Sequence, residues 1–183
     1  MPTVMTIFDG LTTHNIDRRG LLTYLQGQFE IDWGGCHGIA HWARVRANGL
    51  MLAEQTGANC HVVELFAFLH DSRRKNEGID QGHGWRGSIL AEQLRGRFFD
   101  ALDAEMELLR HACVYHSDGV NTGETTVLTC WDADRLDLGR VGMTPDPRYL
   151  GTSAARQESS RRIAHARAIA WVDRQKRWAT DSD

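Results

Sequence analysis

The sequence predicts an all-α protein, a compact helical bundle with one core. Apolar residues recur at helical spacing in most segments, whereas the strict alternation typical of a strand is scarce. The three prolines are Pro2, Pro145 and Pro147, so no proline between Pro2 and Pro145 interrupts a helix. The chain has 183 residues, of which 25% are charged and 42% hydrophobic, as in one soluble globular domain. We therefore expect a single domain over residues 1–183.

The expected helices follow from the spacing of apolar residues and from the residues that stop a helix. Leu21, Leu22 and Leu25 recur near helical spacing, and Gly57 is a stop signal for the second helix. The segment 60–71 is apolar on nearly all sides, as a buried central helix would be. In chain order, the expected helices span residues 16–29, 39–55, 60–71, 84–97, 100–116, about 121–138 and about 154–178.

The clearest helical pattern is the apolar stripe that ends at His116. Its members stand four, three, four and three residues apart: Leu102, Met106, Leu109, Cys113 and His116. Asn121 and Glu124 resemble a capping box that opens the next helix. The polar segment 73–82 and the proline-containing segment 142–151 are expected to be loops.

Composition and charge exclude several classes of protein. The net charge of −3 and the scattered arginines argue against binding to nucleic acid. No apolar run approaches the roughly 18 residues of a membrane-spanning helix, and the N-terminus lacks the pattern of a secretory signal. The cysteines form no CxxC pair, so we expect reduced core thiols in a cytoplasmic protein. Six tryptophans leave room for an aromatic interface in a homo-oligomer.

Several histidines and aspartates stand on apolar helix faces or at the ends of apolar helices. His41 points to the apolar side of its expected helix, while His70 and Asp71 end the most apolar segment. Asp132 and Asp134 each share a helix face with apolar residues. Burying an isolated charge is costly, so such a set favours a shared divalent cation, namely Mn, Fe, Ni, Co, Zn or Mg. A single inward histidine, by contrast, is more often a hydrogen-bonded core residue.

Three motifs carry a resemblance to a known family: His41-Trp42-Ala43-Arg44-Val45, Leu69-His70-Asp71 and Asp132-Ala133-Asp134-Arg135-Leu136-Asp137. In this order they resemble the H…HD…D signature of the HD-domain superfamily of metal-dependent phosphohydrolases, over residues 37–142. The resemblance implies an all-helical fold whose core helices supply one metal ion with His41, His70, Asp71 and Asp134. The family pattern places the last ligand directly before a basic residue and leucine, which favours Asp134 over Asp132.

Two more histidines extend the resemblance. His83, in the segment His83-Gly84-Trp85-Arg86-Gly87, and His116 resemble the later histidines of the dinuclear branches of this superfamily. The resemblance then implies one or two ions per chain, with Asp71 as the bridge. Alternatively, His83 and His116 bind substrate phosphate beside a single ion, or serve as a loop and a core histidine. His37, four residues before His41, is expected to be a neighbour of the site or a helix-start residue.

Positive side chains are expected around a bound phosphate. Arg44 lies one turn from His41, and Arg74 stands three residues after Asp71, where the superfamily often carries a basic residue. We expect Asp71 and Arg74 to act in catalysis. The residues expected to contact substrate are Arg44, Arg74, His83 and His116, with Arg86 and Arg135 as further candidates.

Arg74 is also expected to lie in an exposed loop, so that its loss would leave stability unchanged. The loop 142–149 is expected either to reach over the site or merely to connect two helices.

The function favoured by these residues is hydrolysis of a phosphoester or phosphoanhydride in a nucleotide or similar small molecule. A divalent ion lowers the pKa of bound water and neutralises charge on a phosphoryl oxygen. Two other classes stay open: a dinuclear iron oxygenase on the same scaffold, and a metal-stabilised binding module without turnover.

Overall fold

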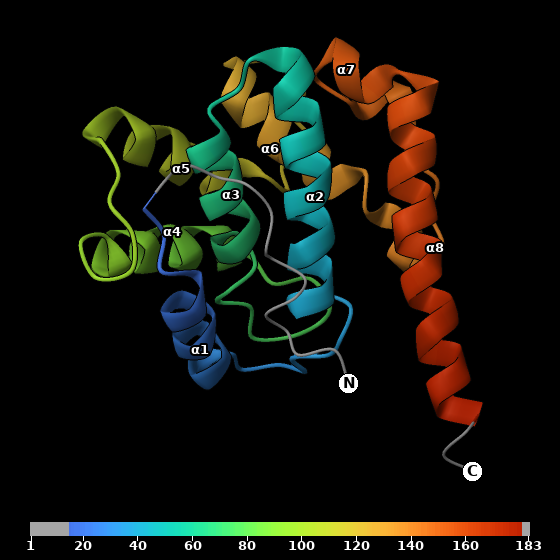
Figure 1. The fold of residues 1–183 in the computed structure, drawn as a ribbon, viewed down its shortest axis with the longest axis horizontal. Helices are drawn as coiled ribbons and strands as arrows, with labels where there is room; N and C mark the ends of the chain where they lie inside the picture. Colours follow the sequence, from blue (N-terminus) through green and yellow to red (C-terminus); the bar gives the residue numbers. More distant parts are fainter. Residues whose placement is uncertain (1–14, 181–183) are drawn as a thin grey trace.

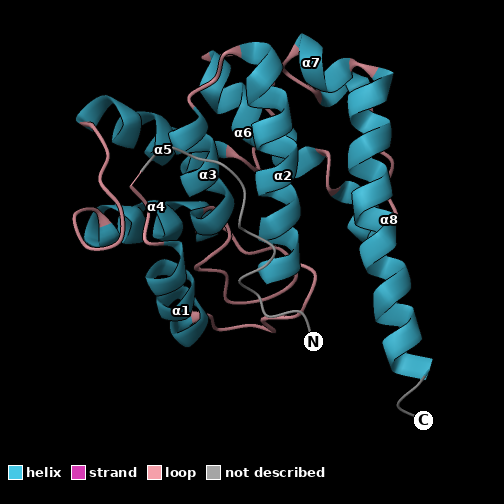
Figure 2. Ribbon diagram, in the orientation of Figure 1, coloured by secondary structure: helices cyan, strands magenta, loops and turns pink. Residues whose placement is uncertain are grey.

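The computed structural model describes the backbone of residues 15–180 and the side chains of residues 15–173. These residues form helices and connecting loops but no strand, apart from isolated bridges at Phe99, so the expected all-α class is confirmed (Figure 2). The N-terminal segment in which we saw no secretory signal lies outside the described residues. The α-helices are α1 (Arg18–Gln28), α2 (Ile39–Thr56), α3 (Cys60–Leu69), α4 (His83–Leu94), α5 (Asp103–Tyr115), α6 (Thr125–Arg135), α7 (Ser153–Arg156) and α8 (Glu158–Thr180). Two 3₁₀ helices, η2 (Leu138–Val141) and η3 (Pro147–Tyr149), follow α6.

Helix α3 is the centre of the bundle, as its apolar sequence predicts. Apart from its first residue, every position of α3 is buried, and α2, α4, α5 and α6 pack around it (Figure 1). Gly49 lets α2 approach closely, because a Cβ at this position would lie 2.5 Å from Val63 Cγ1 on α3. The C-terminal end of α3 therefore carries His70 and Asp71 into the middle of the molecule.

Helices α7 and α8 cover the outer side of α2. Figure 1 shows α8 running alongside α2 at the edge of the bundle, and Arg167 Nη1 on α8 donates to Asn48 Oδ1 at 2.8 Å. A second group of buried apolar side chains lies beneath these helices: Leu52, Leu136, Leu150, Ala154, Ala155 and Ala164. The outer helices thus support the end of α6 and the turn η2 from behind.

Two sequence expectations about helix ends are wrong. The single helix expected at 154–178 is interrupted at Gln157, whose backbone is extended, so α7 and α8 are separate. The capping box is not formed by Asn121, because α6 begins after Glu124, whose carboxylate accepts from Val127 N at 2.9 Å. The amide of Asn121 instead donates to the carbonyl of Arg148.

The cysteines are all free thiols. Cys113 and Cys130 are buried in the core as expected, and Cys60 is half-buried at the start of α3. Cys36 differs, because it lies in the turn before α2 beside polar side chains. Among residues 15–180, no helix has the length and apolar character needed to cross a membrane.

Candidate metal centre

The first group of candidate ligands joins three helices. His41 lies in the first turn of α2, His70 caps the end of α3 and Asp134 lies in the last turn of α6. The Nε2 atoms of His41 and His70 are 3.2 Å apart, and Asp134 Oδ1 lies 3.3 Å and 4.0 Å from them. The two imidazoles are fully buried and the Asp134 side chain is 18% exposed, so these three donor atoms converge on one mostly buried point.

The second group lies on the other side of Asp71. His83 opens α4 and His116 caps α5, so both rings enter from the ends of helices that pack together. The two Nε2 atoms are 2.9 Å apart, and Asp71 Oδ1 lies 3.1 Å from that of His83 and 3.6 Å from that of His116. The loop before His83 therefore brings its ring to Asp71.

Asp71 faces both groups with different oxygens. Its Oδ2 lies 3.6 Å from Nε2 of both His41 and His70, while its Oδ1 faces His83 and His116. A carboxylate placed in this way has the geometry of a bridge between two cations. We call the six residues the four-histidine centre: His41, His70, Asp71, His83, His116 and Asp134.

Each histidine of the centre is oriented by a hydrogen bond from its other ring nitrogen. His41 Nδ1 donates to Asp137 Oδ2 at 2.7 Å, and the other three Nδ1 atoms donate to backbone carbonyls. The carbonyl partners are Phe66 for His70 (3.0 Å), Asp80 for His83 (2.6 Å) and Cys113 for His116 (2.7 Å). In the neutral form of each ring, with the proton on Nδ1, Nε2 directs a lone pair into the centre. Acceptors that face acceptors fit a cation between them, and metal-bound histidines are held by this kind of partner.

The charges of the centre follow from burial and mutual contact. Burial raises the pKa of Asp71, but His70, His116 and His83 outweigh it and hold this pKa well below its usual value. Burial likewise opposes the ionisation of Asp134, yet the hydrogen bond with His41 and the nearby His70 lower its pKa. Burial also lowers the pKa of His70 to about 3, against the pull of the two carboxylates. The centre thus combines ionised carboxylates with a neutral imidazole at His70, which is the donor set that divalent transition metals bind.

One solved structure resembles this chain over nearly its whole length. It is the crystal structure of a predicted HD superfamily hydrolase from an uncultured Thermotogales bacterium, with a TM-score of 0.60 and 24% sequence identity. The alignment covers 92% of this chain and 94% of that one. No protein-family model and no curated protein sequence matches the chain.

The chain has the HD-domain fold. The structure brings the H…HD…D residues of the sequence together, since His41, His70, Asp71 and Asp134 all meet at the four-histidine centre. His83 and His116 lie there too, so the six residues of the sequence hypothesis lie at one place. Within the HD fold, each comes from the end or first turn of a helix that packs against α3 or continues it.

Asp132 and Asp134 lie on different faces of α6 and have different partners. Asp132 turns away from the centre, and its carboxylate accepts from Gly151 N at 2.7 Å and from Thr152 N and Oγ1 at 2.8 Å. It therefore fixes the chain that leads into α7. Asp134, two residues later, faces His41.

Arg44 is paired with a carboxylate beside the centre. Its Nε and Nη2 donate to Asp137 at 2.6 and 3.0 Å, and its guanidinium stacks on the ring of Trp171 at 4.7 Å. Because Asp137 also accepts from His41, Arg44 contacts the centre through that carboxylate, and its contact with substrate stays a prediction. Asp137 is the residue that the sequence analysis left without a role, although it ends the same motif as Asp134.

Arg74 is next to the centre, but its expected exposure is wrong. It is only 8% exposed, and its Nη1 lies 3.2 Å from Asp71 Oδ1 and 3.1 Å from His83 Nε2. Its Nη2 and Nε donate to the carbonyls of Gly78 at 2.7 Å and Asn76 at 3.4 Å. The loop folds back over the guanidinium, which is why a polar segment buries an arginine.

Arg86 and Arg135, the further candidates for contact with phosphate, are paired with other groups of the protein. Arg86 pairs with Asp80 at 2.6 Å, and Arg135 donates to the carbonyls of Tyr149 and Val120. The loop 142–149 is tied to α6 by Arg135, which donates to the Tyr149 carbonyl.

A cavity of about 560 Å³ adjoins the second group of ligands. Arg74 and His83 line it together with Ile79, Val114 and Ser117. This volume lies within the roughly 300–1,000 Å³ typical of small-molecule sites. The cavity therefore offers space for a small ligand with one charged end at Arg74 and His83.

Proposed function

We propose that this chain is a metal-dependent phosphohydrolase that acts on a nucleotide or another small phosphoester or phosphoanhydride. The proposal depends on one observation: four buried imidazoles direct their Nε2 lone pairs, with two carboxylates, at a common centre beside a cavity. The printed name of the similar structure, a predicted HD superfamily hydrolase, supports the broader class. We also propose that residues 1–183 form one domain, because the centre takes residues from α2 to α6.

The candidate ligands divide into two sets that share Asp71. His41, His70 and Asp134 would hold one ion, and His83 and His116 the other, with one oxygen of Asp71 toward each set. Divalent ions bound here would supply a water of lowered pKa and would neutralise charge on the phosphoryl group. Asp137 and the backbone carbonyls keep the imidazoles oriented, so their Nε2 atoms need no rearrangement.

Arg74 would bind the phosphate. Its guanidinium stands at the edge of the cavity and beside Asp71, so it can donate to a phosphoryl oxygen held at the centre. The small volume favours a free small molecule over a folded polymer as substrate. Ile79 and Val114 line the same cavity and would face the less polar end of such a molecule.

The six-residue ligand set also favours a second candidate, a dinuclear iron oxygenase. Both functions use two ions bridged by a carboxylate, and they differ in whether the iron-loaded protein consumes oxygen. A protein that binds metal but turns over neither kind of substrate would be the binding module.

The test is reconstitution of metal-free protein with Mn, Fe(II), Co, Ni or Zn. We expect phosphate release from a panel of nucleoside mono-, di- and triphosphates and a generic phosphoester, and no oxygen consumption. Asp71→Ala should abolish this release, whereas His111→Ala, which changes an exposed histidine of α5, should not. Full activity in Asp71→Ala would contradict the mechanism, and oxygen uptake by the iron-loaded protein would select the oxygenase.

A further inference from the structure

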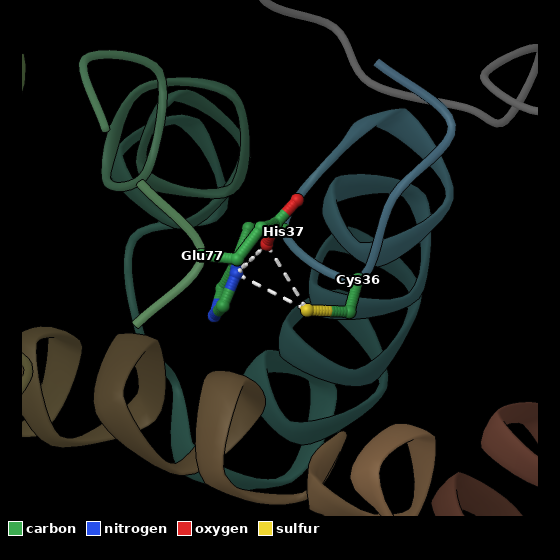
Figure 3. A group of neighbouring side chains, drawn as sticks. All are labelled: Cys36, His37 and Glu77. Carbon is green, nitrogen blue, oxygen red and sulfur yellow. Dashed lines mark hydrogen bonds and ion pairs between the residues drawn. The ribbon is translucent and has the colours of Figure 1, made fainter. Parts of the chain in front are cut away.

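Three side chains of the types that bind metal ions meet a short distance outside the four-histidine centre. Cys36 and His37 lie in the turn before α2, and Glu77 lies in the loop between α3 and α4. Cys36 Sγ is 3.1 Å from Glu77 Oε2 and 3.2 Å from His37 Nδ1, and these last two atoms are also in contact. Figure 3 shows the three side chains pointing toward one another from two different loops. We call them the Cys36 cluster.

The geometry of the Cys36 cluster is not that of a nucleophilic cysteine. A catalytic histidine relays a proton between its two ring nitrogens, with the nucleophile at one and the carboxylate at the other. Here the thiol and the carboxylate both meet Nδ1 of His37. Burial and the neighbouring Glu77 also raise the pKa of the Cys36 thiol to about 11, which disfavours a thiolate in the absence of a cation. Three donor atoms that converge on one point are instead the arrangement of a metal site.

Both loops are held in place by contacts that lead back to the four-histidine centre. Arg74 donates to the carbonyls of Asn76 and Gly78, so it fixes the backbone on each side of Glu77. Arg140 Nε donates to the Cys36 carbonyl at 3.0 Å, and its Nη1 lies 3.8 Å from Asp137. The cluster is therefore positioned before any ligand binds.

A glycine allows the carboxylate to approach. A Cβ at Gly35 would stand 2.6 Å from Glu77 Oε1 and 3.0 Å from the carbonyl of Asp32. Without a side chain at position 35, this oxygen of Glu77 packs against the turn, while the other oxygen faces the thiol and the imidazole.

We propose that Cys36, His37 and Glu77 bind a zinc-class divalent ion that is distinct from the ions of the four-histidine centre. One sulfur, one imidazole nitrogen and one carboxylate oxygen form a mixed donor set that suits Zn²⁺. Tetrahedral ligands at about 2.0–2.3 Å from zinc stand about 3.3–3.6 Å apart. The sulfur contacts of 3.1 and 3.2 Å need to open by only a few tenths of an ångström, whereas His37 Nδ1 and Glu77 Oε2, which are in close contact, must move further apart to admit the ion.

Binding would convert the thiol to a thiolate and release its proton to solvent, and three protein ligands would leave a fourth position open. Glu77 is the most accessible member, with 41% of its side chain exposed, so the ion can enter from solvent on that side.

The site can be tested with cobalt on the metal-free full-length protein. Co²⁺ bound by a thiolate gives a sulfur-to-metal charge-transfer band in the near ultraviolet, which imidazole and carboxylate ligands do not give. We expect this band in the wild type. In Cys36→Ala we expect the loss of the band and of one bound ion per chain. Glu77→Gln, which keeps the thiol and the size of the side chain, should weaken cobalt binding at least tenfold. Cys60→Ala is the matched control, since Cys60 is also half-buried but lies at the start of α3.

A variant of the four-histidine centre separates this proposal from the proposed function. Asp134→Asn should lose an ion from that centre and keep the charge-transfer band. A wild-type protein that shows the band but hydrolyses no substrate of the panel would refute only the phosphohydrolase. The Cys36 proposal is overturned if the wild type shows no band with excess cobalt, or if wild type and Cys36→Ala bind equal numbers of ions.

Discussion

At the scale of single residues, Arg74 connects two groups of candidate ligands. One nitrogen contacts Asp71 and His83 in the four-histidine centre, and the other two hold the backbone around Glu77. A buried guanidinium with this many partners contributes to the fold as well as to a charged substrate. We therefore expect the loss of Arg74 to lower the stability of the protein, and not to leave it unchanged.

We expect Arg74→Ala to lower the free energy of unfolding by about 1–3 kcal/mol, because it leaves buried acceptors without their donor. We also expect kcat/KM to fall at least tenfold, equivalent to about 1.4 kcal/mol of transition-state stabilisation. Lysine at this position should restore only part of the activity, since an ammonium cannot replace the planar fork.

Arg73→Ala is the control for Arg74→Ala. Arg73 pairs with Glu30 and the carbonyl of Gln28 at the surface, so its loss should cost no more than about 0.5 kcal/mol. Urea denaturation and steady-state kinetics measure the two effects separately. An Arg74→Ala protein as stable as the wild type would show that the hydrogen bonds from Arg74 to the loop carbonyls contribute nothing to stability.

At the scale of elements, helix α6 carries two carboxylates with different tasks. Asp132 holds the chain that leads to α7, whereas Asp134 faces His41. We expect Asp132→Ala to destabilise the protein by about 1–3 kcal/mol for each buried donor left unsatisfied, with metal content per folded chain unchanged. Asp134→Asn should instead lower the metal content and leave the stability of the metal-free protein nearly unchanged. Elemental analysis and thermal unfolding distinguish them, and equal metal loss in both variants would refute this division.

Helices α4 and α5 bring His83 and His116 together because Gly84 allows close packing. A Cβ at Gly84 would stand 2.0 Å from the carbonyl of Cys113, the same carbonyl that accepts from His116. Gly84→Ala should therefore push the helices apart, lower the melting temperature and weaken metal binding by the second group. Gly27→Ala, in α1 with open space around it, should instead stabilise the protein by up to about 1 kcal/mol. Wild-type metal binding in Gly84→Ala would show that this packing does not set the distance between the histidines.

The helices could be predicted from the sequence because apolar spacing is a local property. The buried α3 and the stripe ending at His116 lie within a few residues of where that spacing places them. The roles of polar residues depend on distant partners instead: Arg44 binds Asp137, which lies 93 residues further along the chain. Helical spacing gives no information about such a contact.

The Cys36 cluster was missed for the same physical reason. Glu77 is 41 residues from Cys36, and two irregular loops bring them together. The adjacent Cys36 and His37 were the only local signal, and the sequence analysis treated His37 as a neighbour of the site or a helix-start residue.

At the scale of the whole molecule, the four-histidine centre is where five helices meet. Its residues come from α2, the end of α3, the start of α4, the end of α5 and α6, and α8 supports the outer side of α2. Only the folded chain brings these donor atoms together. Any cation bound at the centre therefore stabilises the native state relative to the unfolded state.

Removal of metal should consequently lower the melting temperature of the entire protein. A ligand at 100 to 1,000 times its Kd stabilises the native state by about 2.7–4.1 kcal/mol. For a chain of this size each kcal/mol shifts Tm by about 2–4 °C, so the metal-loaded protein should melt roughly 5–15 °C above the chelated one. Differential scanning calorimetry with and without a chelator measures this difference.

The difference in Tm should depend on Asp71, the one carboxylate that faces both groups of histidines. In Asp71→Ala the chelator should change Tm by much less than in the wild type, whereas His111→Ala should keep the full shift. The Nε2 atoms of His83 and His116 are 2.9 Å apart, and those of His41 and His70 are 3.2 Å apart. If protons and hydrogen bonds alone held the centre together, each of these two pairs would require a shared proton. In that case the chelator would shift the Tm of the wild type no more than that of Asp71→Ala, and the centre would not be a metal site.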